Sequence, residues 1–241
     1  MTVTLVLISL AAFFTSSLTA AMGVGGGVIL LALLAQIVPS AVVIPLHGAA
    51  QLVSNTSRVF VQRQHINWAY ILPFFVGGVV GAAVLVPWVR DVPDGVGELL
   101  LGIFILIATW RAQWLGLSQW HPSASGGVTT GLSLILGATG PLVMSVLPRD
   151  TWTRQMVVGT HGMAMVLQHG IKVVAFSSMD FDWSAWWPML IGITLGTIAG
   201  NQFGAKLLGQ WEEAQFKKAL DVLLTILAIR LAWQGLEKLI T

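Results

Sequence analysis

Cysteine is absent from the sequence, and charged residues are scarce. None of the 241 residues is a cysteine, and only 9% are charged. The absence of cysteine excludes disulfide bonds, thiolate metal sites and a cysteine nucleophile. Soluble domains carry about 25% charged residues, so this composition argues against a water-soluble domain. The few basic residues form no patch of the kind that binds nucleic acid, and we expect no nucleic-acid partner.

Acidic residues are missing from the middle of the apolar stretches. All ten Asp and Glu residues lie in loops or near the ends of hydrophobic runs. Ionisable residues inside a membrane mark ion pathways, so the absence of carboxylates there disfavours a cation path and favours an anion. The sequence also lacks His-Glu-x-x-His, paired catalytic carboxylates and a phosphate-binding loop with lysine. These absences argue against an intramembrane enzyme, and we expect no metal site.

Hydrophobic runs make up most of the chain. Hydrophobic residues account for 56% of it, and the mean hydropathy is +0.82. The runs cover residues 2–46, 41–62, 68–89, 96–115, 124–148, 153–176, 183–207 and 215–240. A membrane-spanning helix needs about 20 apolar residues, and all eleven tryptophans lie at or near the ends of runs, as interfacial belts do. The sequence predicts an all-α, multi-pass integral protein of the inner (cytoplasmic) membrane. Its first residues lack the basic region of a cleaved signal peptide.

Two of the runs are interrupted by small residues. The first contains the cluster 23–27, with four glycines in five residues, and the fifth is broken by Gly-Ala-Thr-Gly-Pro at 137–141. Glycine weakens a helix, and irregular backbone at membrane depth is tolerated only where protein buries it or a cavity adjoins it. We predict that residues 23–27 and 137–140 are non-helical tips of two re-entrant hairpins, with free N–H groups that suit an anion. The alternative is a close helix–helix contact through small residues.

The chain repeats itself once. A shift of 114 residues places His47 on His161 and Arg58 on Lys172, and a shift of 115 places Trp68 on Trp183. The predicted halves are residues 1–116 and 117–241. If the two interrupted runs are hairpins that return to the side they came from, eight of the twelve Lys and Arg residues fall on one side, in line with the positive-inside rule. This favours an inverted repeat, in which each half is a hairpin plus three transmembrane helices. The alternative is a parallel repeat with eight spans.

A polar stripe follows one face of the second run. His47, Gln51, Asn55 and Arg58 recur there at the helical period. In a membrane, such a face needs a partner or a water-filled path. The matching run places His161, Gln168 and Lys172 on one face in the same way. The alternative is that the two histidines only hydrogen-bond neighbouring backbone and hold helices together.

These patterns together predict a binding site for a small anion near the middle of the membrane. The predicted substrate-binding residues are Gly25, Gly26, Gly27, His47, Gln51, Thr139, Gly140, His161 and Gln168. Asn55, Arg58 and Lys172 are predicted to line the pathway or its gates. We expect Arg58 and Lys172 to lie near opposite mouths and attract anions by their field, although ordinary snorkelling to the interface explains them as well.

The residues carry a resemblance to a known family. The glycine cluster at 23–27, the restart of the second half at Gly131-Leu132-Ser133 and the stretch 137–141 resemble the TauE/SafE family of sulfite and organosulfur-anion transporters. Members often have a proline a few residues after the first cluster, and the stretch 28–31 here has none. The resemblance implies transport of small sulfur oxyanions, sulfonates or other organic acid anions, without a cofactor.

The sequence therefore favours a secondary transporter for a small anion. If a proton gradient drives it, His47 and His161 are the candidate proton carriers, with His169 behind them, because imidazole titrates near neutral pH. A passive anion channel is one alternative. An intramembrane enzyme, with Ser133 as nucleophile and His161 or His169 as base, is another. The expected partners are the anion, the lipid bilayer and protons. The sequence does not decide whether the protein forms a homodimer.

Overall fold

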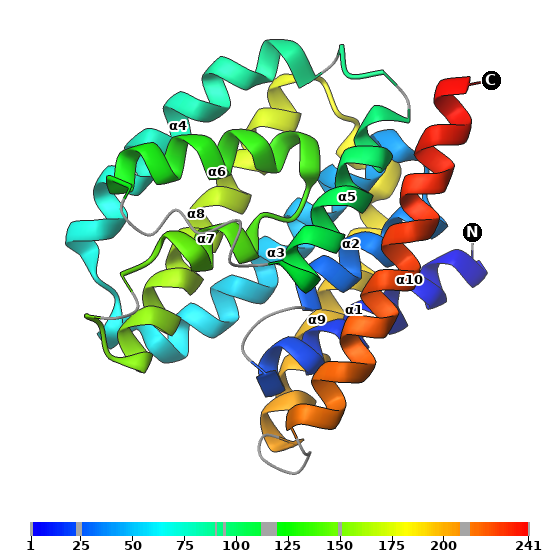
Figure 1. Cartoon of the computed structure of the whole chain (residues 1–241). Coiled ribbons are helices and arrows are strands. Elements are labelled where there is room, and N and C mark those ends of the chain that lie inside the picture. Colours follow the sequence, from blue (N-terminus) through cyan, green and yellow to red (C-terminus); the bar gives the residue numbers. More distant parts are fainter. Residues whose placement is uncertain are drawn as a thin grey trace.

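The protein is helical throughout the part that the structure describes. The computed structural model describes residues 2–22, 26–89, 91–93, 95–111, 120–148, 151–207 and 213–240. Within these ranges the chain forms ten α-helices and two short 3-10 helices, and no strand (Figure 1). The predicted all-α class is confirmed.

The helices follow the hydrophobic runs closely. In the first half they are α1 (Thr2–Met22), α2 (Gly26–Ile37), α3 (Ser40–Gln62), α4 (Trp68–Val89) and α5 (Val96–Trp110). In the second half they are α6 (Pro122–Leu136), α7 (Gly140–Val146), α8 (Arg154–Ser178), α9 (Trp187–Leu207) and α10 (Glu213–Ile240). The 3-10 helices are η1 (Arg63–His65) and η3 (Trp183–Trp186). Both interrupted runs thus divide into two helices, α1 with α2 and α6 with α7.

The two interruptions are shorter than the sequence predicted. Gly26 and Gly27 are the first residues of α2, and Gly140 is the first residue of α7, so the prediction of a non-helical state was wrong for these three. A helix start tolerates glycine because the first N–H groups have no partner within the helix in any case. Residues 137–139 are non-helical as predicted, and residues 23–25 lie outside the described residues.

Gly137 fixes the second interruption. Its φ is +78°, a left-handed conformation that glycine adopts without the strain that a side chain would bring. Its N–H donates to the carbonyl oxygen of Ser133 at 3.0 Å and ends α6. The chain then turns through Ala138 and Thr139 and enters α7.

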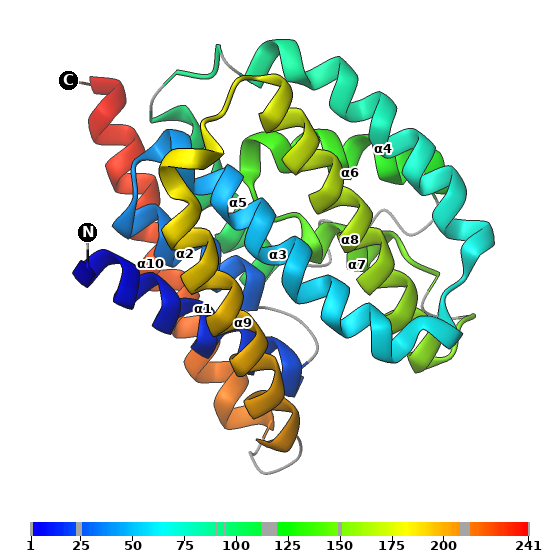
Figure 2. The same cartoon turned by 180° about the vertical axis from the view of Figure 1, so that it is seen from behind.

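The main helix pairs each join one half of the chain to the other. α1 packs along α9, α4 along α6, α5 along α10 and α3 along α8 (Figures 1 and 2). Small residues make two of these contacts close: Gly196 of α9 lies against the backbone of Ser9, and Gly81 of α4 lies against the backbone of Gly127. The close helix–helix contact that was the alternative for the glycine clusters is thus present at these glycines, and it is also present at Gly26, which lies against the backbone of Thr15 in α1.

α3 and α8 run antiparallel through the middle of the molecule (Figure 2). Gly48 of α3 faces Lys172 of α8, and Val59 of α3 faces Gly162 near the other end of the pair. α2 lies in the largest apolar cluster, where Leu30, Leu31 and Leu34 are fully buried. The same packing holds the starts of α2 and α7 against the middle of the α3–α8 pair, where the polar stripes meet.

Two of the described helices have the length and hydropathy of a membrane span. They are α1, over Val3–Ala20, and α4, over Trp68–Val89. On α4 the side chains of Leu72, Val76 and Val80 are exposed, as lipid-facing residues are. α3 and α8 are as long, but their polar stripes face inward and lower their mean hydropathy. The predicted arrangement of six full spans and two hairpins stays a prediction.

Candidate functional site

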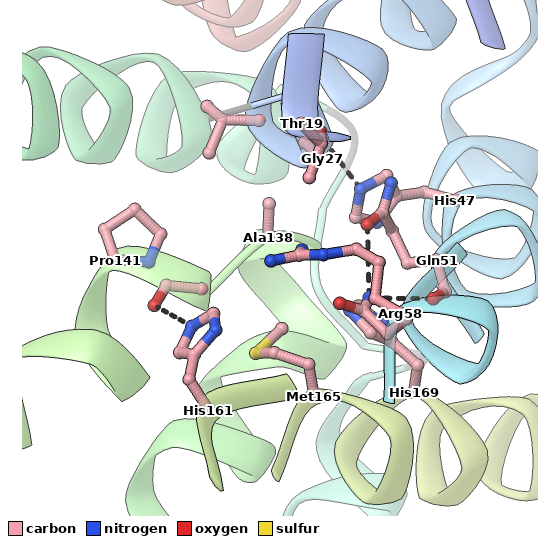
Figure 3. Close-up of a pocket in the computed structure, with 13 residues that line it drawn as sticks. Thr19, Gly27, His47, Gln51, Arg58, Ala138, Pro141, His161, Met165 and His169 are labelled. Atoms are coloured by element: carbon pink, nitrogen blue, oxygen red, sulfur yellow. Dashed lines mark hydrogen bonds between the residues drawn. The ribbon is translucent and has the colours of Figure 1, made fainter. Parts of the chain in front are cut away.

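A small cavity lies where the starts of α2 and α7 face the α3–α8 pair. Its volume is about 60 Å³. The residues that line it are Thr19, Gly27, Val28, His47, Gln51, Asn55, Arg58, Ala138, Gly140, Pro141, His161, Met165 and His169 (Figure 3). One water molecule needs about 10–15 Å³ of such space, so the cavity admits an ion of a few heavy atoms. Both predicted tips and both predicted polar stripes therefore meet at one place.

His47 and His161 each hold the start of a helix. Nε2 of His47 lies 2.8 Å from the carbonyl oxygen of Gly27, and Nε2 of His161 lies 3.2 Å from that of Gly140. A carbonyl oxygen only accepts hydrogen bonds, so both Nε2 atoms donate. The second ring nitrogen, Nδ1, is buried in both residues and has no hydrogen-bond partner. The structural role that was the alternative is therefore present, and it leaves one nitrogen of each ring available to a ligand or water.

His169 is a third histidine of the site, and it was not among the predicted substrate-binding residues. Its ring packs edge-on against that of His47, with the ring centroids 5.6 Å apart, and its Nδ1 is also buried without a partner. A signal for it was present in the sequence. His169 follows His161 by eight residues and Met165 by four, which places all three on one helix face.

Arg58 contributes the positive charge of the cavity. Its side chain comes from α3 and reaches across the cavity toward Ala138 (Figure 3). Arg58 is thus a lining residue of the cavity, and its predicted place near a mouth stays a prediction. Gln51 and Asn55 line the same wall, and Asn55 Nδ2 donates to the backbone carbonyl of Gln51 at 2.8 Å.

Thr139 and Gln168 lie behind the cavity, not in its lining. Gln168 Nε2 donates to Thr139 Oγ1 at 2.5 Å, and Thr139 Oγ1 donates to the carbonyl oxygen of Thr129 at 3.1 Å. Both side chains are fully buried. This chain of hydrogen bonds ties the turn between α6 and α7 to α8, so the two residues position the tip instead of facing the cavity.

The three predicted glycines of the first tip are placed differently from one another. Gly27 lines the cavity, whereas Gly26 packs against Thr15 and Thr19 of α1. Gly25 lies outside the described residues. Of Gly26 and Gly27, the second faces the space that an anion would occupy and the first does not.

Lys172 is not at a mouth, contrary to the prediction. Its side chain is fully buried, and Nζ donates to the carbonyl oxygen of Gly137. Gly137 caps the C-terminus of α6, where the helix dipole places negative charge, so the ammonium group has a favourable partner there. This geometry excludes snorkelling to an interface for Lys172.

The chemistry of the lining favours an anion. Arg58 and the N-terminus of α2 offer donors and positive charge, and His47 and His161 add a charged donor at Nδ1 when they take up a proton. No Asp or Glu is among the described residues that line the cavity. No cluster of three or more His, Asp or Glu suited to a metal occurs among the residues that the structure describes. Ser133, the candidate nucleophile, donates to the carbonyl of Thr130 at 2.8 Å and is not in the lining.

Comparison with known proteins adds one finding to this geometry. Residues 8–231 match the model of a protein family described as Sulfite exporter TauE/SafE. The match includes both interruptions, the α3–α8 pair and every residue that lines the cavity. No curated protein and no solved structure matches the chain.

Proposed function

The chain belongs to the TauE/SafE family of sulfite exporters, and from that premise we propose that it is a secondary transporter that moves a small anion across the cytoplasmic membrane. The observation that carries the proposal is the cavity between the two helix starts, where Arg58 and three histidines surround a space of about 60 Å³. Its size favours sulfite or a short sulfonate or carboxylate over a long organic acid.

Arg58 is the residue that gives the proposed site its selectivity for negative charge. A guanidinium offers a planar set of donors that matches the oxygen atoms of an oxyanion. The first N–H groups of α2 and the positive end of its dipole both lie at the start of the helix, and both favour an anion bound there. Gln51 and Asn55 line the wall beside Arg58.

The proposed architecture is an inverted repeat with two re-entrant hairpins. The helix pairs support a two-fold repeat: α1 packs on α9 as its counterpart α6 packs on α4, and the pairs α3–α8 and α5–α10 each join two counterparts. The antiparallel course of α3 and α8 favours the inverted form, because counterparts in a parallel repeat would run in the same direction. In the sequence, α6 and α7 of the second half correspond to α1 and α2 of the first. Inverted-repeat transporters bind substrate near the midplane, at interrupted helices of the two repeats.

Proton coupling through the histidines completes the proposal. In each of His47 and His161, Nε2 donates to a backbone carbonyl, so a proton taken up from solution goes to Nδ1. The ring would then carry positive charge and a second donor next to the anion. Anion and proton would bind together and leave together, which makes the protein a proton–anion symporter.

An uptake screen in proteoliposomes tests the function. Sulfite, thiosulfate, sulfoacetate, taurine and small carboxylates are offered to the purified protein with and without an imposed proton gradient. We expect saturable accumulation of one or more anions, increased by a gradient directed inward. Flux that neither saturates nor accumulates anion against its gradient would identify a passive channel instead. No flux of any of these anions would contradict the proposal.

A further inference from the structure

A second cavity lies where α3 begins and α8 ends, farther along the α3–α8 pair than the first. Its volume is about 350 Å³. Its lining includes Ile44 and Pro45 of α3, Leu134 and Ile135 of α6, and Phe176 of α8. One carboxylate, that of Glu98, lines it and is paired with Lys238 at 2.6 Å.

On each element that both cavities touch, a short stretch of chain separates the two linings. On α3 the second cavity ends at Pro45 and the first begins at His47. Between α6 and α7 the second ends at Ile135 and the first begins at Ala138. On α8 the first cavity ends at His169 and the second begins at Phe176. The separating layer therefore passes through Leu46, Gly137 and residues 170–175.

Lys172 fills this layer. Its Nζ donates to the carbonyl of Gly137, and its aliphatic carbons lie against Gly48, where an added Cβ would come within 2.9 Å of Lys172 Cδ. Leu31 closes the other side of Gly137. Apart from Lys172 the layer is largely apolar, so an anion crossing it alone would lose its hydration without compensation.

We propose that Lys172 is the gate between the two cavities: its ammonium group holds the path shut while it donates to Gly137, and it opens the path by transferring its hydrogen bonds to the anion. This inference rests on the proposed transport function and adds a role for one residue to it. The anion leaves Arg58, passes His47 and His169, and meets the ammonium in the layer. The carbonyl of Gly137 takes the ammonium back once the anion has moved on.

The two measurements that separate a gate from a binding residue are affinity and flux. Affinity is the Kd for sulfite of the purified protein in detergent, from isothermal titration calorimetry. Flux is the initial rate of uptake of radiolabelled sulfite into phosphatidylethanolamine–phosphatidylglycerol vesicles. The variant is Lys172→Met, which keeps the length of the side chain and removes its charge. Lys218→Met, at an exposed position of α10, is the matched control.

We expect Lys172→Met to lower the flux by at least about tenfold, because the anion then crosses an apolar layer without a counter-charge. Its Kd should stay within about threefold of the parent value, because the cavity that holds Arg58 is unchanged. Lys172→Arg should restore part of the flux, and Lys218→Met should change neither quantity. Gly48→Ala, which crowds the lysine without removing its charge, should lower the flux and leave the Kd unchanged.

Each other result is decisive in its own way. Flux of Lys172→Met within twofold of the parent would overturn the gate and leave the transport function intact. Loss of sulfite binding together with flux, in a variant that is still monodisperse, would make Lys172 a binding residue and overturn the gate as well. If Lys172→Met does not fold, unchanged flux in Gly48→Ala would overturn the gate. A parent protein that neither binds nor carries sulfite or the other anions of the screen would remove the transport function itself.

Discussion

Arg58 and Lys172 occupy matching positions of the two halves, 114 residues apart, yet the structure places them in opposite situations. The guanidinium of Arg58 reaches into the first cavity, whereas the ammonium of Lys172 is buried against Gly137 between the two cavities. The histidines of the two halves differ much less, since His47 and His161 both donate to the start of a helix. The helix starts are thus held alike in both halves, whereas the basic residues are placed differently.

This difference is what one conformation of an inverted-repeat transporter should show. If the two halves exchange conformations during transport, the basic residue on the open side faces the substrate and its counterpart on the closed side is sealed. The structure then represents the state in which the cavity of Arg58 is formed and the gate of Lys172 is shut. In the other state the roles of the two residues would be exchanged.

The largest effect is expected from Arg58→Gln. It removes the only charged donor that lines the cavity among the described residues, and charge-assisted hydrogen bonds of this kind contribute enough to lower sulfite affinity roughly 10- to 100-fold. Calorimetric titration of the purified variant measures the change. Arg63→Gln, an exposed residue of η1 just beyond α3, is the control. Lys172→Met should leave the Kd for sulfite nearly unchanged, whereas Arg58→Gln should raise it. Equal Kd values for Arg58→Gln and the parent would therefore contradict the proposed difference between the two residues.

A smaller effect, of roughly tenfold on flux, is expected from His47→Gln and from His161→Gln, because a glutamine can donate to the same carbonyl but cannot take up the proton. Flux measured between pH 5.5 and 8 should depend on pH in the parent and much less in the double variant. His65→Gln, in the exposed η1, is the control. If the double variant keeps the pH profile of the parent, the histidines do not carry the proton.

Thr139→Val should act on stability more than on transport. It breaks the chain from Gln168 through Thr139 to Thr129, and a buried donor left without a partner costs about 1–3 kcal/mol. We expect a lower midpoint of thermal unfolding and an affinity reduced only a few-fold. Thr56→Val, which removes an exposed hydroxyl that bonds within α3, is the control. An unchanged midpoint would show that this chain does not hold the second tip.

The smallest effects separate the two helix starts. A Cβ at Gly27 would lie 3.1 Å from Gln51 Oε1, the end of a flexible side chain, whereas a Cβ at Gly140 would lie 3.8 Å from Met165 Cε. Gly27→Ala should therefore raise the KM for transport by less than about threefold, and Gly140→Ala should leave it unchanged. A larger rise in KM for Gly140→Ala than for Gly27→Ala would contradict the finding that the space beside Gly27 is the tighter of the two.

The sequence predicted the helical class and the place of the site because both follow from periodicity. Apolar runs of fixed length define the helices, and polar residues at the helical period fix which faces of α3 and α8 meet. His47, Gln51 and His161 were found in this way. His169 was predicted as a further proton carrier but not as a substrate-binding residue, because the stripe through Gln168 and Lys172 defines a face one residue away.

What the sequence could not give is the direction in which long or branched side chains point. Lys172 is long enough to reach an interface or a backbone carbonyl, and only the position of the turn at Gly137 decides between them. Thr139 sits on the predicted tip, yet its hydroxyl turns back to α6 because Thr129 offers a carbonyl there. Gly26 and Gly27 are helical because glycine density alone does not say where, within a small-residue cluster, a helix begins.

The pairing of helices across the two halves also has a consequence for biosynthesis. α1 is made first, but its partner α9 follows only after most of the chain has been synthesised. Until α9 is made, the helix that packs along α1 is missing, so the hydroxyls of Thr15, Ser16 and Thr19, which are buried in the folded protein, are not yet fully enclosed by protein. Membrane insertion would therefore be followed by a late step that closes α1 onto α9. By the same logic, separately expressed fragments 1–116 and 117–241 should each be short-lived alone and persist when made in the same cell, since every main helix pair needs both.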